Sequence, residues 1–439
     1  MGIVVGAWRL NNPEKQKHMD AAQKERLLSR GVVEIIDESE FVKLLESDRP
    51  LRLKVGFDPS APDLHLGHAV LLRKLRQLQD LGHQVVIIVG DWTAQIGDPS
   101  GRSAMRPMLT AAQVLKNAES YLEQFSKIVD RDKTEIRMQS EWFGPFNLSN
   151  VFELTSKFTV AQFLAREDFA KRFKANQPIA ITELLYPLLQ GYDSVAVESD
   201  VEFGGTDQKF NLLVGRDLQR MMDQRPQQCL LVPILVGTDG VRRMGKSLGN
   251  YIGLNEPPND MYGKIMSLPD ESADPDPQDG EVGEPQTRNT ILDYFDYLTD
   301  VPTTELTEMR DGLADGTVKP MELKKRLADE LVAQFHDADA AHNARDHFER
   351  TVQRKELPDD IPIYEISETM EGKRISDLIV DAGMAESSSA AKRLITQGAV
   401  KKDGVAVATN EAVTTITDSS IVQVGRRRMI RATRVPKAL

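Results

Sequence analysis

Two histidines three residues apart stand at the start of a predicted helix, directly after a predicted strand. His65 and His68 belong to segment 63–68, Asp-Leu-His-Leu-Gly-His. They lie near one helix face, and a helix N-terminus with two imidazole donors suits a phosphate chain. Gly67 leaves room for a flat ring to approach the backbone. A metal-binding pair or a surface pair fits the same spacing, but with seven histidines in the chain and no obvious third ligand nearby, we expect no metal site.

A basic loop forms the second cluster of residues whose side chains could take part in a reaction. Arg242, Arg243, Met244, Gly245, Lys246 and Ser247 follow an apolar stretch at 229–236. Cations on a loop beyond a strand end can close over phosphates. Taken alone, this hexamer fits a solvated charge run equally well.

The elements around these clusters alternate between strand and helix. Residues 51–57 read as a strand, leucines at three-to-four spacing up to Leu81 predict a helix ending at Gly82, and 85–89 is a continuous apolar run. Strand, helix and strand of this length form a βαβ unit. Further strands at about 201–203 and 229–236 extend the pattern. We therefore predict an α/β fold with an open, mostly parallel sheet, which binds ligands beyond its strand ends.

The remaining chain divides by composition into further segments. Residues 269–287 contain seven acidic residues and no Lys or Arg, which predicts an exposed loop. The expected organisation is an N-terminal helical arm at 1–50, a catalytic domain at 51–268 with a largely helical insert at about 110–195, the acidic loop at 269–287, a helical domain at 288–355, a linker at 356–371 and a small α+β module at 372–439.

Composition excludes several classes of protein. A single cysteine, Cys229, rules out an internal disulfide and favours a reducing cytoplasm. No apolar run approaches the roughly 18 residues of a membrane span. The net charge of −12 argues against indiscriminate nucleic-acid binding. The charge is unevenly distributed, however, because residues 372–439 carry +6 and the remainder −18.

Three further motifs narrow the interpretation. They are Ile-Gly-Asp-Pro-Ser at 96–100, Tyr-Pro-Leu-Leu-Gln-Gly-Tyr-Asp at 186–193 and Gly-Gly-Thr-Asp-Gln at 204–208. Together with the histidine pair and the basic loop, they resemble the bacterial tyrosyl-tRNA synthetase family of class I aminoacyl-tRNA synthetases. The resemblance covers 51–268 most strongly, extends over 288–355 and 372–439, and is absent from 1–30 and 270–287. It implies a Rossmann-like, doubly wound catalytic domain, then a helical anticodon-side domain and an RNA-binding domain of ribosomal-protein type.

The resemblance also implies roles for individual residues in binding L-tyrosine. Asp98, Tyr186 and Gln190 would hold the α-ammonium, and Asp193 would accept a hydrogen bond from the tyrosine hydroxyl. Gln208 would lie near the carboxylate and the α-phosphate.

For ATP, entering as its Mg²⁺ complex, the resemblance implies a second set of roles. Asp207 would bind the ribose, while Gly205 would allow close approach of the backbone. His65 and His68 would stabilise the α-phosphate in the transition state, and Lys246 and Arg243 the leaving pyrophosphate. Arg102 and Arg106 would assist there and near the tRNA acceptor end. Further expected ATP-binding residues are Gly56, Asp58, Ser60, Met244 and Ser247.

Several positions depart from the commonest family pattern. Arg243 and Gly245 replace the usual lysine and serine of the basic loop, which exchanges a point charge for a planar fork. Lys54 stands where many members place a tyrosine that touches the substrate hydroxyl, and Asp91 stands where many have glycine. We hypothesise that Lys54 contributes to the tyrosine pocket through a Lys54–Asp91 pair.

The implied activity is a tyrosine–tRNA ligase that acts as a homodimer built on the helical insert, with tRNA(Tyr) crossing between subunits. In the C-terminal module, Lys392, Arg393, Lys401 and Lys402 would face RNA phosphates; a solubilising face is the alternative.

Three other functions stay open. An RNA-binding protein without catalysis is supported only by the altered basic loop. An adenylate-forming enzyme that passes tyrosine to a non-RNA acceptor is disfavoured, because such an enzyme would not need the basic module at 372–439. A tryptophan-specific relative is disfavoured by Asp193, because indole has no hydroxyl to pair.

Overall fold

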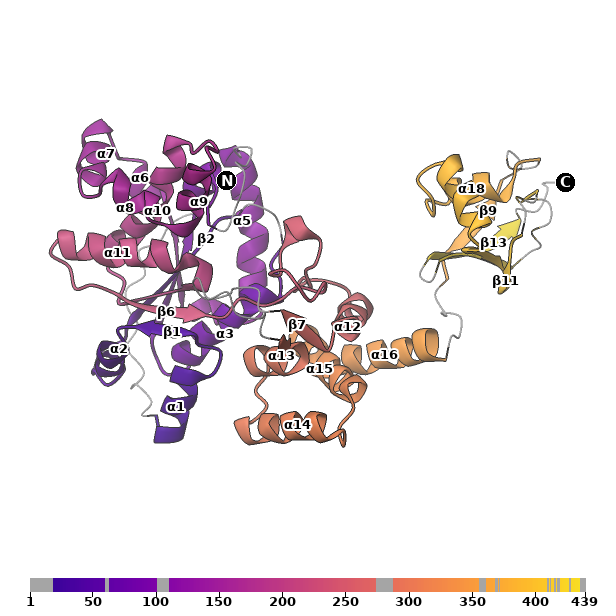
Figure 1. Cartoon of the computed structure of the whole chain (residues 1–439), viewed down its shortest axis with the longest axis horizontal. Coiled ribbons are helices and arrows are strands. Elements are labelled where there is room, and N and C mark those ends of the chain that lie inside the picture. Colours follow the sequence, from indigo (N-terminus) through magenta and orange to yellow (C-terminus); the bar gives the residue numbers. More distant parts are fainter. Residues whose placement is uncertain are drawn as a thin grey trace. The chain divides into compact units, whose positions relative to one another are not determined.

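The computed structural model comprises two units, residues 1–345 and 346–439, each with its own sheet (Figure 1). It describes residues 19–59, 63–100, 110–273, 287–354, 361–367, 370, 372–408, 410, 412–413, 416, 419–425 and 428–434.

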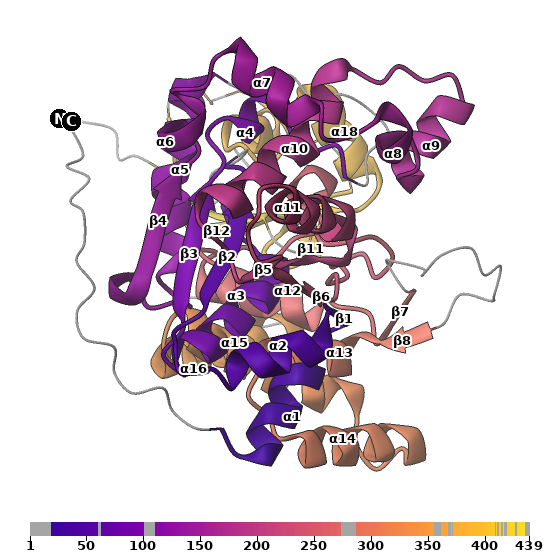
Figure 2. The ribbon, with the colours of Figure 1, turned by 90° about the vertical axis from the view of Figure 1, so that its left-hand side faces the viewer.

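Six strands form the main sheet of the first unit, in the order β1-β6-β5-β2-β3-β4 (Figure 2). β1 is antiparallel to β6, and all other neighbours are parallel. The strands are β1 (Glu34–Ile36), β2 (Arg52–Phe57), β3 (Gln84–Val89), β4 (Thr134–Met138), β5 (Val201–Gly205) and β6 (Gln228–Val232). β3 and β6 are buried along almost their whole length, as their continuous apolar runs predict.

The chain leaves the centre of this sheet in two opposite directions. From β2 it passes through α3 (Leu66–Gln79) to β3, and from β5 through α11 (Lys209–Met221) to β6 on the other side. Because both crossovers between parallel strands are right-handed by default, α3 and α11 cover opposite faces (Figure 1). This arrangement confirms the predicted doubly wound α/β fold and puts the switch point between β2 and β5.

The other helices of the first unit surround this sheet or follow it. Before β6 they are α1 (Ala21–Ser29), α2 (Glu38–Leu45), α4 (Thr93–Ile96), α5 (Ala111–Phe125), α6 (Ser140–Phe143), α7 (Leu148–Thr155), α8 (Val160–Leu164), α9 (Glu167–Lys174) and α10 (Ile181–Ala196), with short 3-10 turns η1 (Arg131–Lys133) and η2 (Thr206–Gln208). After β6 they are η3 (Lys246–Leu248), α12 (Pro258–Met266), α13 (Thr290–Leu298), α14 (Thr303–Asp315) and α15 (Pro320–Phe335). Helix α16 (Ala338–Phe348) begins in the first unit and ends in the second, where the π-helical turn η4 (Glu349–Gln353) follows it.

The structure corrects the predicted segments at three places. β1 lies in the expected helical arm and β4 lies in the expected helical insert, yet both are strands of the main sheet. Both are short strands of half-buried residues and lack a continuous apolar run. The predicted acidic loop begins and ends in a two-stranded pair, β7 (Glu271–Ala273) with β8 (Thr287–Asn289); its residues 274–286 lie outside the described residues.

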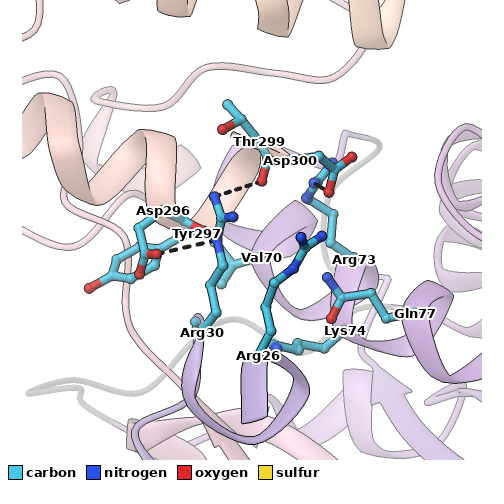
Figure 3. Close-up of a pocket in the computed structure, with 11 residues that line it drawn as sticks. Arg26, Arg30, Val70, Arg73, Lys74, Gln77, Asp296, Tyr297, Thr299 and Asp300 are labelled. Atoms are coloured by element: carbon cyan, nitrogen blue, oxygen red, sulfur yellow. Dashed lines mark hydrogen bonds and ion pairs between the residues drawn. The ribbon is translucent and has the colours of Figure 1, made fainter. Parts of the chain in front are cut away.

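A polar junction joins α1 and α3 to the C-terminal end of α13 (Figure 3). The buried Arg30 guanidinium donates to the carbonyls of Phe295 and Thr299, each at 3.0 Å, and to those of Asp296 and Val301. Arg73 donates to Asp300 at 2.7 Å. Because the last carbonyls of a helix have no partner within it, Arg30 acts as the cap that docks α13 against the sheet domain.

The second unit is a five-stranded sheet with two helices. Its strand order is β11-β10-β12-β13-β9, with β9 parallel to β13 and the other pairs antiparallel. The elements are β9 (Ile363–Ile366), α17 (Ile375–Asp381), α18 (Ser388–Thr396), β10 (Val400–Lys402), β11 (Val405–Ala406), β12 (Ser420–Val424) and β13 (Arg428–Arg434). The predicted hairpin is present, with positive φ at Asp403 and Gly404.

The predicted linker at 356–371 was wrong for β9, which belongs to the module's sheet. Residues 363–366 stand close behind Pro362 and form an edge strand of only four residues, so their pattern is too short to signal a strand.

Replacing Arg30 with methionine removes a donor from four buried or half-buried carbonyls, of which that of Phe295 still accepts from Thr299. We expect the free energy of unfolding of the first unit to fall by about 2–4 kcal/mol, measured by urea-induced loss of circular dichroism. Arg26→Met is the matched control, because Arg26 borders the same pocket but is exposed; it should change stability by less than about 0.5 kcal/mol. Equal losses in the two variants would contradict the capping role.

Candidate active site

A cleft of about 1080 Å³ opens at the carboxyl ends of β2 and β5, the switch point of the sheet. It brings together most of the side chains singled out in the sequence. Those lining it are Gly56, Asp58, His65, His68, Asp98, Tyr186, Gln190, Asp193, Gly205, Asp207, Gln208, Arg243, Met244, Lys246 and Ser247. Ser60, Arg102 and Arg106 lie outside the described residues.

The histidine pair stands at the N-terminus of α3, with ring centroids 4.0 Å apart. Nδ1 of His68 accepts the His65 backbone N–H at 3.2 Å, which places the proton of the neutral His68 ring on Nε2. Burial, together with the nearby Lys246 charge, lowers the pKa of His68 to about 3. Burial also lowers the pKa of His65 well below its ordinary value. Both rings are therefore uncharged N–H donors at neutral pH.

Gly67 gives the His65 ring its place. A Cβ on Gly67 would lie 3.0 Å from two atoms of that ring, Cε1 and Nδ1. A larger residue at position 67 would press on the His65 ring, so the packing of this ring favours glycine.

The basic loop is anchored to the end of the sheet and faces the cleft. The Met244 N–H donates to the Leu235 carbonyl at 2.7 Å, and Arg243 forms a bridge with Val236. Arg243 Nη1 lies 2.7 Å from Asp207 Oδ2. Lys246 Nζ donates to the Tyr121 hydroxyl at 3.0 Å and lies 4.9 Å from the centroid of that ring. Each cation is therefore held against another residue of the cleft wall.

Asp98 and Gln208 form another hydrogen-bonded group that lines the cleft. Asp98 accepts the Ser100 backbone N–H through Oδ1 and the Gln208 side-chain amide through Oδ2, each at 2.8 Å. Asn211 Nδ2 then donates to the amide oxygens of Gln208 and Gln190, both at 3.0 Å. This chain of bonds fixes the orientation of three predicted substrate-binding side chains.

Tyr186 and Asp58 connect α10 to the end of β2. The Tyr186 hydroxyl donates to Asp58 Oδ2 at 2.9 Å, and Thr93 donates to Asp58 Oδ1 at 2.7 Å. Burial, and then the Asp58 charge, raise the pKa of Tyr186 well above its ordinary value, so its hydroxyl stays protonated. A Cβ on Gly90 would come within 2.3 Å of Asp58 Oδ1, so this arrangement requires glycine there.

Asp193 is a buried carboxyl at the wall of the cleft. Its Oδ2 accepts from Gln139 Nε2 at 2.8 Å, and its Oδ1 accepts from Trp142 Nε1 at 3.1 Å. Burial raises the pKa of Asp193 to about 7, opposed chiefly by the positive charge of Lys54. Asp193 is thus a fixed hydrogen-bond acceptor whose charge is sensitive to its surroundings.

Lys54 does not line the cleft, and the hypothesis of a Lys54–Asp91 pair was wrong. Lys54 lies opposite Glu202 in the register of β2 and β5, and its Nζ lies 2.9 Å from Glu202 Oε1. Asp91 comes after the end of β3, and its Oδ1 accepts the Ser140 backbone N–H at 3.0 Å. The carboxylate nearest to Lys54 is thus that of Glu202 on the neighbouring strand. The alternation of residues along a single strand does not reveal which residue lies opposite on the next strand.

The predicted RNA-binding residues lie in the second unit. Lys392 and Arg393 are exposed on α18, and Lys401 is exposed on β10 beside the half-buried Lys402. All four thus come from two consecutive elements of the module.

The described residues contain no group of three or more His, Cys, Asp or Glu side chains placed to hold a metal ion. No helix among them has the length and apolarity needed to cross a membrane.

Comparison with known proteins decides the family. The profile of the tRNA synthetases class I (W and Y) matches residues 46–353. The tyrosine–tRNA ligase of Dehalococcoides mccartyi strain 195 is 57% identical over 408 residues, which cover 93% of this chain and 98% of that protein. That of Thermotoga maritima is 47% identical over 413 residues, covering 94% and 98%. The chain belongs to the tyrosine–tRNA ligase family. Like its members, it is an aminoacyl-tRNA synthetase of class I, a family that uses ATP.

Solved tyrosyl-tRNA synthetases share this fold. The enzyme of Archaeoglobus fulgidus, in complex with L-tyrosine, superposes with a TM-score of 0.58 at 23% identity, covering 74% of this chain and 100% of that one. At this identity the likeness shows the fold alone.

Several residues of the site escaped sequence reasoning. Gln139, Trp142, Glu202 and Asn211 stand outside the matched motifs, yet they hold Asp193, Lys54 and the two glutamines. A signal was available for Glu202 alone, because Lys54 and Glu202 are opposite charges within two apolar strands, and buried charges are normally paired. The others are polar residues of ordinary composition, which only the fold brings to the cleft.

Proposed function

We propose that the chain activates L-tyrosine with ATP to form tyrosyl-adenylate and then transfers the tyrosyl group to the 3′-terminal ribose of tRNA(Tyr). The observation that carries this proposal is the meeting of the histidine pair, the basic loop and the hydroxyl-pairing carboxyl in one cleft at the switch point. Family membership gives the reaction class, and the position of these residues in one cleft supports the roles that we propose for them.

At the amino-acid end, Asp98, Tyr186 and Gln190 bind the α-ammonium. Asp193 accepts from the phenolic hydroxyl, with both its oxygens already oriented by Gln139 and Trp142. A site that buries an acceptor for this hydroxyl leaves it unpaired when phenylalanine enters; tyrosyl-tRNA synthetase is itself a standard example of such rejection. Gln208 then lies beside the substrate carboxylate.

At the nucleotide end, ATP enters as its Mg²⁺ complex. Its ribose binds Asp207, and Gly205 lets the nucleotide come close to the protein backbone. The tyrosine carboxylate attacks the α-phosphorus, a C(O)–O–P bond forms, and the bond to the β-phosphate breaks to release pyrophosphate. The carboxylate is already anionic, so no protein base is needed. His65, His68, Lys246 and Arg243 stabilise charge that develops on phosphate oxygens.

The histidines suit this role as neutral donors. Because their pKa values are lowered, both rings stay uncharged at neutral pH and add no positive charge to the cleft. Each ring can therefore donate an N–H to an anionic phosphate without a change of protonation. We assign Gly56, Asp58, Ser60, Met244 and Ser247 to the ATP contacts, and Arg102 and Arg106 to pyrophosphate and the tRNA acceptor end.

Wild-type protein should catalyse tyrosine-dependent ATP–pyrophosphate exchange, and Asp193→Asn should lose most of its preference for tyrosine over phenylalanine. We expect kcat/KM for tyrosine to fall at least about 100-fold, because a charged acceptor is lost and the buried amide presents a donor to the hydroxyl. Asp217→Asn, an exposed aspartate on α11, is the control and should leave exchange unchanged. Absence of exchange in folded wild-type protein would contradict the proposed function.

The second unit is proposed to bind tRNA through Lys392, Arg393, Lys401 and Lys402. Removal of residues 361–439 takes away the whole module including β9, so no strand is left unpaired. We expect exchange to be retained and tRNA charging to fall, with a weaker salt dependence of the remaining tRNA affinity. Charging at the full rate would show that the module is not needed for tRNA.

A homodimer is proposed through the helices between β4 and β5. Five large apolar side chains are at least 60% exposed on α7, α8, α9 and the start of α10: Leu148, Phe152, Val160, Phe173 and Ile181. Such a gathering is typical of an interface. We also retain the predicted cytoplasmic location as part of this proposal.

Phe152→Glu combined with Ile181→Glu should convert the dimer into monomers, because two charges would be buried without partners in the interface. Light scattering after size-exclusion chromatography measures the mass. Val405→Glu changes an equally exposed apolar residue in the second unit and is the control. A dimer that persists in the double variant would place the interface elsewhere.

A further inference from the structure

A fully buried ion pair lies behind the tyrosine end of the cleft. Lys54 on β2 and Glu202 on β5 face each other in register, and their side chains are 0% and 1% exposed. Neither residue lines the cleft. Charges taken fully out of water are costly, and an apolar pair of similar volume is often as stable, so such a pair calls for a role besides stability.

Lys54 binds one turn of α10. Its Nζ donates to the Gln190 backbone carbonyl, to Ser194 Oγ and to Glu202 Oε1, each at 2.9 Å. All three ammonium donors are therefore used. The bound turn from Gln190 to Ser194 also carries Asp193, so one ammonium fixes the backbone that presents two residues of the tyrosine pocket.

Glu202 completes the network on its other side. It accepts from Ser194 Oγ at 3.0 Å, from Gln227 Nε2 at 2.5 Å and from the Gln190 side-chain amide at 3.3 Å. Gly215 on α11 leaves the room for these bonds, because a Cβ there would lie 2.8 Å from Gln227 Nε2 and 2.9 Å from Ser194 Oγ. The network is thus built into the contact of α10 with α11 and the sheet.

Asp193 is the ionisable group of the cleft on which both members of this pair act. The groups acting on it are Lys54 from β2, Glu202 from β5, and the uncharged donors Gln139 and Trp142 from the segment after β4. Tyr186, earlier in α10, also interacts with it. Lys54 lowers the pKa of Asp193 and Glu202 raises it, so the two members of the pair act in opposite directions.

We infer that Lys54 and Glu202 are positioning residues for tyrosine recognition, which fix the Gln190–Ser194 turn and set the charge of the Asp193 carboxyl that receives the substrate hydroxyl. The inference rests on the proposed function only for the identity of the substrate. The placement of the pair and its effect on Asp193 are properties of this chain alone.

The direct test follows the ionisation of Asp193 through the indole N–H of Trp142. The chain has three tryptophans, so ¹⁵N-indole spectra contain few signals, and Trp142→Phe identifies the one bonded to Asp193. In wild-type protein this signal should titrate with a midpoint of about 7. Lys54→Met should raise the midpoint and Glu202→Gln should lower it, each by about one pH unit.

Lys74→Met is the matched control, because Lys74 is also a buried lysine but lies on α3 away from the cleft. It should leave the midpoint unchanged. If Lys54→Met fails to fold, Glu202→Gln still tests the inference through the opposite sign of its shift. A merely structural pair would lower thermal stability in both variants without shifting the midpoint in opposite directions, and that result would overturn the inference.

The kinetic test measures KM for tyrosine against pH in ATP–pyrophosphate exchange. For wild-type protein KM for tyrosine should rise as the pH falls through about 7, because Asp193 becomes protonated. At pH 7, Lys54→Met should raise KM for tyrosine about fivefold, because a midpoint higher by about one pH unit lowers the ionised fraction of Asp193 by that factor. Glu202→Gln should extend tight binding to lower pH, and KM for ATP should stay constant in both variants. Unchanged pH profiles in both variants would again overturn the inference. Wild-type protein without exchange would instead contradict the proposed function, and the indole titration would still decide the role of the pair.

Discussion

The removal of one carboxyl from water is the constraint around which the rest of the site is arranged. Asp193 is buried, and an unpaired polar group there would be costly, so Gln139 and Trp142 each donate to one of its oxygens. Three elements must therefore meet at this point: α10, the segment that follows β4, and the β2–β5 pair behind it. The close contact of α10 with α11 at Gly191 and Gly215 is part of the same arrangement, since larger residues would hold the helices apart.

The cations of the cleft are arranged on a different principle. Asp193 is held by two uncharged donors. Arg243 instead contacts the carboxylate of Asp207, and Lys246 contacts the hydroxyl of Tyr121; both of these partners border the cleft. A planar guanidinium at position 243 can form a well-directed bond to a carboxylate, which an ammonium makes less specifically. The proposed binding of a ribose at Asp207 would therefore compete with the contact that Asp207 makes with Arg243.

The sequence predicted the fold class and the members of the cleft because both depend on local patterns. Apolar runs predicted β3 and β6, and the spacing of the leucines up to Leu81 predicted α3. Strands β1, β4 and β9 were missed because short, half-buried or edge strands carry little periodicity. Lys54 was assigned the wrong partner because pairing across strands is a property of the register, which no single strand encodes. Gln139 and Trp142 were missed because they stand in no motif. They matter only because the fold brings them within hydrogen-bond distance of Asp193.

The parallel pairing of β9 with β13 has a consequence beyond the module's own architecture. These are the first and last strands of its sheet, so the polypeptide enters and leaves the module through neighbouring strands. Every backbone partner that the sheet needs is thus encoded in one uninterrupted stretch of sequence. In evolutionary terms, such a stretch is a transferable cassette: a single recombination event at the gene level can append it to an unrelated protein, or remove it, without leaving a broken sheet on either side.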